Sequence, residues 1–224
     1  MMIGFEVVAA YAGVALLGAM SPGPDFALVS RFAALRGRPA GLGAAAGVAA
    51  GMAVNTVAAV VGVGAALAAS PTVFRVITLA GAAYLCYLGV RSLLAARTTD
   101  AGALVDGDSG TERDAGSGTR SGSGRNDVRW AAFRQGLITN VLNPKSIVFL
   151  VALLPQFLTD RSTWADKTLL GVVTVLMVLL WFTAVSLAVG SFQAFFRRPA
   201  ARRALHAATG LVLIALALVI VLTS

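Results

Sequence analysis

The sequence has few of the residues on which metal centres, disulfides and soluble surfaces depend. It contains one cysteine and one histidine, and only 12% of its 224 residues are charged. A single cysteine excludes an internal disulfide and a multi-thiolate metal site, and one histidine cannot supply a metal triad. A soluble domain carries about 25% charged residues. These absences argue against a soluble enzyme or a metalloprotein, so we expect no cofactor and no bound metal.

The chain is instead rich in apolar sequence. Hydrophobic residues make up 58% of it, and its mean hydropathy is +0.82. Because a helix needs about 20 apolar residues to cross the hydrocarbon core, we expect an all-α integral membrane protein with six transmembrane helices. The first apolar run lacks a preceding Lys or Arg and contains Glu6, so we expect a retained helix rather than a cleaved signal. The expected spans are residues 5–20, continued past a break, and 41–69, 72–95, 137–158, 168–195 and 204–222.

The basic residues are divided unevenly among the connections between these spans. The first, third and fifth connections hold fourteen of the 18 Lys and Arg residues. Because connections rich in Lys and Arg stay in the cytoplasm, we expect these three there, next to anionic membrane lipids, and both termini outside. The net charge of +8 then reflects topology and not nucleic-acid binding, since no stacking aromatic residues accompany it. The opposite connections hold Arg75, Arg161 and Lys167.

Residues 98–128 differ from the rest of the chain. They are rich in Gly, Ser and Arg and contain almost no apolar residues, so they cannot offset the entropy of folding. We expect a flexible cytoplasmic linker between a first three-helix repeat, 1–97, and a second, 129–224. An odd number of spans in each repeat makes the second enter the membrane from the opposite side, which is the arrangement of an inverted repeat.

The first apolar run is interrupted by a short polar sequence. Pro22, Gly23 and Pro24 are expected to end one helix, and Pro24 with Asp25 suits the first turn of the next. The free amide groups of such a helix start favour an anion, for example a substrate carboxylate. A charged side chain near the bilayer centre costs about 2.5–3.5 kcal/mol. Asp25 at this depth therefore indicates a function.

The fourth apolar run has a matching interruption. Asn143 and Pro144 break it, and Lys145 follows at once. Helices broken at corresponding places in two repeats are typical of the binding site of a secondary transporter. With one acid, Asp25, one base and two exposed helix ends, the site suits a zwitterion such as an α-amino acid.

Structural roles for the same residues stay open at this point. Asp25 and Lys145 can neutralise each other as an ion pair, or Asp25 can cap a helix. Pro22 and Pro144, taken alone, indicate a kink as readily as a site. The coincidence of proline with charge at both places favours a site.

These motifs resemble those of the LysE/RhtB superfamily of bacterial amino-acid exporters. The resemblance is carried by Ser21-Pro22-Gly23-Pro24-Asp25 and by residues 81–91, 133–149 and 153–157, so it covers nearly the whole chain except the linker. It implies a six-span efflux carrier of the bacterial cytoplasmic (inner) membrane that is driven by proton exchange.

Two further residues are candidates for the site. The superfamily often has a histidine or an acid in the second span where this chain has Asn55. A neutral amide can bind substrate but cannot carry a proton, which leaves Asp25 as the proton carrier; a plain interhelical hydrogen bond is the alternative for Asn55. Gln156 is a second candidate, near the outer end of the fourth span. Gly43, Gly47 and Gly51 have the small-xxx-small spacing of closely packed helices.

The functional prediction is a proton-coupled secondary exporter of amino acids or close derivatives. The alternatives are export of another small metabolite or a metal ion, an intramembrane enzyme, and a non-transporting scaffold. Metal export would need more Cys, His or carboxylate groups, and the serines within the spans have no histidine nearby to act as a base. A scaffold leaves both charged breaks unexplained. The oligomeric state, including a homo-oligomer, and the identity of the amino acid stay open.

Overall fold

A computed structural model describes residues 4–21, 23–97, 124–158, 162–188 and 199–223 of the chain. Within these ranges the fold is all-helical and has no strand, as predicted. Pro22 and most of the expected linker, residues 98–123, lie outside the described residues. The helices are α1 Phe5–Met20, α2 Pro24–Arg36, α3 Arg38–Ala69, α4 Pro71–Arg97, α5 Gly124–Val141, α6 Pro144–Leu153, the 3₁₀ helix η1 Leu154–Phe157, α7 Trp164–Leu187 and α9 Pro199–Thr223.

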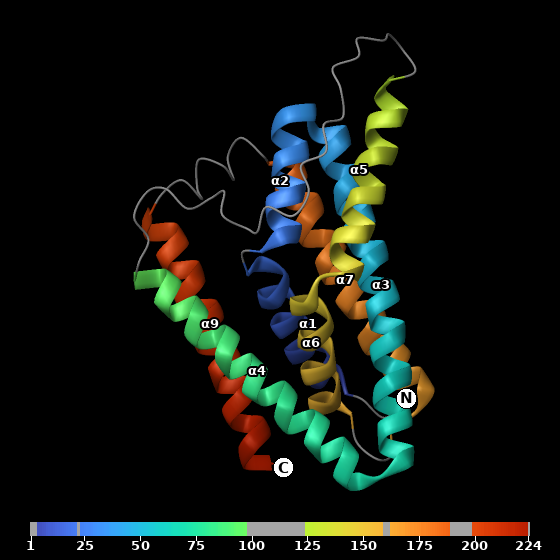
Figure 1. The fold of residues 1–224 in the computed structure, drawn as a ribbon, viewed down its shortest axis with the longest axis vertical. Helices are drawn as coiled ribbons and strands as arrows, with labels where there is room; N and C mark the ends of the chain where they lie inside the picture. The colour runs from blue at the N-terminus through green and yellow to red at the C-terminus, as the bar shows by residue number, and fades with distance from the viewer. Residues whose placement is uncertain (1–3, 22, 98–123, 159–161, 189–198, 224) are drawn as a thin grey trace.

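Two pairs of helices are broken where the sequence predicts interruptions. The axes of α1 and α2 differ by 65°, and those of α5 and the α6–η1 segment by 55°. Figure 1 shows the two pairs running in opposite directions along the long axis of the molecule, with both breaks near mid-height. Each break begins its second helix with proline, a residue suited to the first helical turn because it has no N–H to pair there.

The described residues contain up to five of the six expected membrane spans. Among the described residues, parts of α3, α4 and α7 are each long and apolar enough to cross a membrane, and each bent pair adds one candidate, which makes five. The sixth expected span falls in α9, a helix of 25 residues whose described apolar stretch is His206–Val219.

The helix that leads into the fourth expected span begins well before the apolar run. Helix α5 begins at Gly124, thirteen residues before the expected start and inside the expected linker. Its first half carries Arg125, Asp127 and Arg129, so hydropathy does not mark it as a helix. The helix forms because one of its faces packs against α3, with Ala132 and Gly136 buried in the contact.

Glycine allows α3 and α5 to approach closely, as the small-residue spacing predicts. A Cβ atom added at Gly43 would lie 2.6 Å from the carbonyl oxygen of Arg129, and one at Gly51 would lie 2.8 Å from that of Leu137. At Gly47 an added Cβ would collide with the carbonyl group of Phe133. The backbones of the two helices are therefore in contact along three turns, as in other small-residue interfaces in membranes.

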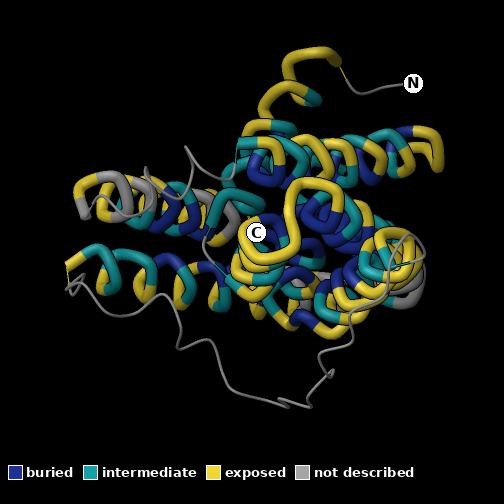
Figure 2. The backbone as a smooth tube through the Cα atoms, turned by 90° about the horizontal axis from the view of Figure 1, so that it is seen from above, coloured by how far each residue is buried: buried dark blue, intermediate teal, exposed yellow. Residues whose placement is uncertain are grey.

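The other helices close the bundle. Helix α7 packs against α1 and α3, and α4 pairs with α9, where an added Cβ at Gly89 would lie 2.9 Å from the carbonyl oxygen of Gly210. Figure 2 shows buried residues facing between the helices and exposed residues on the outside. Many of the exposed side chains are apolar, for example Val57, Val61 and Leu180, as expected for a surface in contact with lipid.

Substitution of Gly47 by alanine should weaken the α3–α5 contact. The added methyl group forces the two backbones apart, and overpacking of this kind costs about 1–3 kcal/mol. We expect a lower free energy of unfolding for Gly47→Ala in mixed-micelle denaturation. Gly62→Ala in the same helix is the matched control, because nothing lies within 4 Å of its added Cβ. Equal stability of the two variants would contradict this account of the contact.

Candidate functional site

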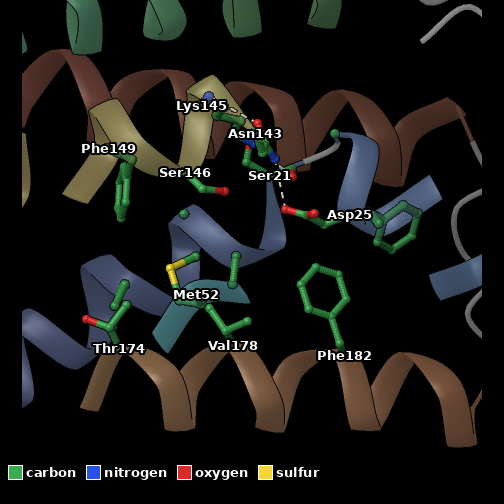
Figure 3. Close-up of a pocket in the computed structure, with 15 residues that line it drawn as sticks. Ser21, Asp25, Met52, Asn143, Lys145, Ser146, Phe149, Thr174, Val178 and Phe182 are labelled. Carbon is green, nitrogen blue, oxygen red and sulfur yellow. Dashed lines mark hydrogen bonds between the residues drawn. The ribbon is translucent and has the colours of Figure 1, made fainter. Parts of the chain in front are cut away.

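A pocket lies between the two helix breaks. It has a volume of about 460 Å³, including the part open to its surroundings, and residues of α1, α2, α3, α6 and α7 line it. Figure 3 shows Ser21, Asp25, Asn143, Lys145 and Ser146 on one side of this space. The two predicted interruptions thus meet at one site, although more than a hundred residues separate them in the sequence.

The first break exposes the carbonyl end of α1. Ser21 caps this helix in an extended conformation, and the ammonium group of Lys145 donates a hydrogen bond to its carbonyl oxygen at 3.1 Å. Lys145 lies close to Gly23 as well, since a Cβ added there would be in ordinary van der Waals contact with the Nζ atom, at 3.5 Å. A cation at the carbonyl end of a helix is favourable because the helix dipole is negative there. Lys145, which belongs to the second break, therefore satisfies the carbonyl group that the first break exposes.

The second break uses its own side chain as a cap. The Oδ1 atom of Asn143 accepts a hydrogen bond from the backbone N–H of Lys145 at 3.0 Å, and the N–H of Ser146 donates to the carbonyl oxygen of Asn143 at 3.1 Å. We expected this helix start to offer free amide groups to an anion. The first two amide groups after Pro144 are instead bonded within the protein, so the positive group that α6 contributes is the Lys145 side chain.

Asp25 lies in the first turn of α2 and is buried, with 9% of its surface exposed. Its Oδ2 atom accepts hydrogen bonds from the amide groups of Asn140 at 3.0 Å and Asn143 at 2.9 Å. Its Oδ1 atom is also buried, and no described residue forms a hydrogen bond with it. A buried acceptor of this kind costs about 1–3 kcal/mol when it has no partner. Asp25 lines the pocket, so a proton or a positively charged ligand group can satisfy this oxygen.

The wall opposite the charged groups is mostly apolar. It is formed by Met52 of α3 and by Val178 and Phe182 of α7, and Phe149 of α6 lies beside it. The pocket therefore has a charged side and an apolar side, an arrangement that suits a small molecule with a charged head and a short apolar body. Within the described ranges, no group of three His, Cys, Asp or Glu residues comes close enough to hold a metal ion.

The remaining candidate residues are not all at the pocket. Asn55 is buried in α3 and bonds to Asn140 of α5, so the interhelical hydrogen bond considered for it is present. Gln156 is in η1, and neither it nor Asn55 is among the residues that line the pocket. Pro24 and Pro144 each occupy the first turn of a helix, and Pro22 lies outside the described residues.

Sequence reasoning missed Asn140 and gave Ser146 no place at the site. Asn140 is fully buried in the last turn of α5, and its amide group donates to Asp25 and, at 3.3 Å, to the Ser146 hydroxyl group. The available signal was the pair of asparagines at 140 and 143, because residues three apart share a helix face. An amide in an apolar run needs a polar partner, and Asp25 was the buried candidate.

Asn143→Ala should destabilise the protein. It removes the cap of α6, which contributes about 0.5–2 kcal/mol, and one of the two hydrogen bonds to the Asp25 carboxylate. We expect a loss of about 1–3 kcal/mol in mixed-micelle denaturation. Asn126→Ala is the matched control, since Asn126 is an exposed asparagine near the start of α5. Equal denaturation curves for the two variants would mean that the break does not depend on its cap.

Comparisons with known proteins identify the family of the chain. The family model of LysE type translocators matches residues 16–224. A homoserine/homoserine lactone efflux protein of Salmonella typhimurium is 28% identical over 207 residues, which are 92% of this chain and 91% of that protein. A threonine efflux protein of the same organism is 30% identical over 186 residues, which are 83% of this chain and 81% of that protein. No solved structure matches. The family match extends over nearly the whole sequence and includes both helix breaks, and the chain belongs to the LysE type translocator family.

Proposed function

We propose that this protein is a secondary active exporter that carries small amino acids or close derivatives out of the cytoplasm in exchange for protons. The observation that carries the proposal is the charged side of the pocket, where Asp25 and Lys145 both line the space between two broken helices. Membership of a translocator family supports transport, and the names of the relatives, which describe efflux of homoserine and threonine, support amino acids as the substrate.

The pocket offers a partner for each end of a zwitterion. The Oδ1 atom of Asp25 can accept a hydrogen bond from a substrate ammonium group, because no described residue occupies it. The ammonium group of Lys145, which also bonds to Ser21, attracts a substrate carboxylate. Both groups lie on one side of the pocket, so the substrate side chain would extend toward Met52 and Val178.

The apolar wall favours a short substrate side chain. Phe149 and Phe182 bound the pocket, and a Cβ added at Gly18 would lie 2.5 Å from the ring of Phe149. A long or charged side chain would have to displace these rings or lose its hydration. A small amino acid, like those in the names of the relatives, fits without such a loss.

Proton coupling would use the same carboxyl group. Asp25 can hold a proton or a substrate ammonium group at Oδ1, but not both, so the two compete for one atom. Competition of this kind couples the outward movement of one to the inward movement of the other, as the two repeats alternate between conformations. Asn55 and Gln156, which do not line the pocket, have no direct part in this exchange.

The opposite directions of the two broken pairs support an inverted repeat in the bacterial inner membrane. The connection between α2 and α3, next to Arg36 and Arg38, and the start of α5, with Arg125 and Arg129, lie at the same end of the molecule (Figure 1). The end of α9 lies at the other end. With the basic end in the cytoplasm, substrate would enter the pocket from that side and the termini would lie outside.

Asp25→Asn should abolish coupled export and leave the protein in the membrane, because an amide cannot take up a proton. The measurement is efflux from bacteria loaded with a mixture of dipeptides, with the medium profiled by mass spectrometry. Empty vector gives the background. Glu6→Gln, which neutralises an exposed carboxylate near the start of α1, should export like the wild type. Normal export by Asp25→Asn would rule out Asp25 as the coupling site.

The proposed orientation can be tested with single cysteines in a Cys86→Ser background. A cysteine at Ser162, between η1 and α7, should react with a membrane-impermeant maleimide added to intact cells. A cysteine at Ser109, in the expected linker, should react only after the cells are permeabilised. The reverse pattern would place the basic connections outside and overturn the orientation.

A further inference from the structure

A chain of buried amide groups connects α3 to the carboxylate of Asp25. Asn55 of α3 donates from Nδ2 to the backbone carbonyl oxygen of Asn140 at 2.8 Å, and the same atom lies 3.4 Å from Asn140 Oδ1. Asn140 in turn donates to Asp25. We propose that Asn140 is a positioning residue for the Asp25 carboxylate, and that Asn55 sets the orientation of Asn140. This inference rests on the proposed function, because it takes Asp25 as the group that meets substrate and proton.

The carbonyl group of Asn140 is available to Asn55 because of the helix break. In an uninterrupted helix it would accept a hydrogen bond from the N–H of residue 144. Residue 144 is proline, which has no N–H. The N–H of Asn143 reaches this carbonyl oxygen at 3.1 Å, and Asn55 supplies a second donor. Asn55 therefore stabilises the break itself, from a helix that is not part of it.

The backbone carbonyl oxygen of Asn140 fixes the orientation of the side-chain amide groups of both Asn55 and Asn140. A backbone carbonyl oxygen can only accept, so Asn55 must present its NH₂ group to it. The same NH₂ group faces the Oδ1 atom of Asn140, which leaves the NH₂ group of Asn140 directed at Asp25. An inverted Asn140 amide would place two oxygen atoms together at Asp25 and two NH₂ groups together at Asn55.

The orientation of the Asn140 amide determines which oxygen of Asp25 is bonded within the protein and which is left for a ligand in the pocket. Two donors, from Asn140 and Asn143, converge on Oδ2, and no described residue bonds to Oδ1. The carboxylate is thereby held with one oxygen bonded within the protein and the other free for substrate or proton. Because Asn55 is anchored in α3, the orientation of Asn140, and with it one of the two hydrogen bonds to Oδ2, depends on the packing of α3 against α5.

The test measures how readily Asp25 reacts with a hydrophobic carbodiimide, which adds to a protonated carboxyl group. Hydrogen bonds donated to a carboxylate favour its charged form, so their loss should increase labelling at a fixed pH. In the full-length protein in membrane vesicles, we expect Asn140→Leu and Asn55→Leu each to raise labelling of Asp25 at least threefold, measured by peptide mass spectrometry. Asp25→Asn identifies the background.

Thr56→Val is the matched control. Thr56 is the neighbour of Asn55 in α3 and is similarly buried, but its hydroxyl group has no hydrogen-bond partner among the described residues. Valine has the same shape as threonine, and Thr56→Val leaves the hydrogen bond from Asn55 to Asn140 in place. If a substitution here raised labelling only by loosening α3, Thr56→Val would raise it too. We expect labelling of Asp25 in Thr56→Val to equal that of the wild type.

The outcomes separate the positioning role from the transport proposal. If Asn55→Leu leaves the labelling of Asp25 unchanged, or if Thr56→Val raises it equally, the positioning role is overturned, whatever the transport results. If Asn140→Leu fails to insert into the membrane, the labelling of Asp25 in Asn55→Leu is enough to decide whether the positioning role holds. Amino-acid export by the same strains is measured separately. A wild type that exports none would refute the transport proposal, while the labelling pattern would still decide whether the amide chain holds Asp25.

Discussion

The structure depends on one constraint, which is that a polar backbone group freed by a helix break cannot turn to water inside a membrane. Each break frees such groups, and three of them bond to side chains at the two breaks or on α3. The carbonyl group of Ser21 is bonded by Lys145, the N–H of Lys145 by Asn143, and the carbonyl group of Asn140 by Asn55. The residues that satisfy the backbone are the ones that place charge and amide groups at the pocket. Stability of the breaks and chemistry of the site therefore have the same origin.

The glycine contact between α3 and α5 is a condition for this arrangement. Asn55 lies one turn beyond Gly51, where an added Cβ would lie 2.8 Å from the Cβ of Asn140. A larger residue at this level would push the two helices apart and lengthen the hydrogen bond from Asn55 to the Asn140 carbonyl group. The close packing of α3 and α5 thus determines whether the carbonyl group freed by Pro144 can be satisfied from α3 at all.

Much of this could be predicted from the sequence because proline and charge are conspicuous in apolar runs. Both breaks and the glycine contact follow from local patterns, whose meaning does not depend on the rest of the fold. The start of α5 did not follow, because its helix is stabilised by contact with α3 and not by apolar composition. The roles of Asn140 and Asn55 did not follow either. An asparagine shows that a polar partner is needed, but the choice of partner depends on how distant helices pack.

The hydrogen bond from Lys145 to Ser21 also has a consequence for how the protein is made. A ribosome completes the first break more than a hundred residues before it adds the lysine that satisfies it. Until then the end of α1 has to rely on a temporary partner, such as water, lipid headgroups or the insertion machinery. The first half of the chain is therefore synthesised before the final partner of this carbonyl group exists. Final assembly of the first half has to wait for the second, and synthesis of both halves is required before either has its mature form.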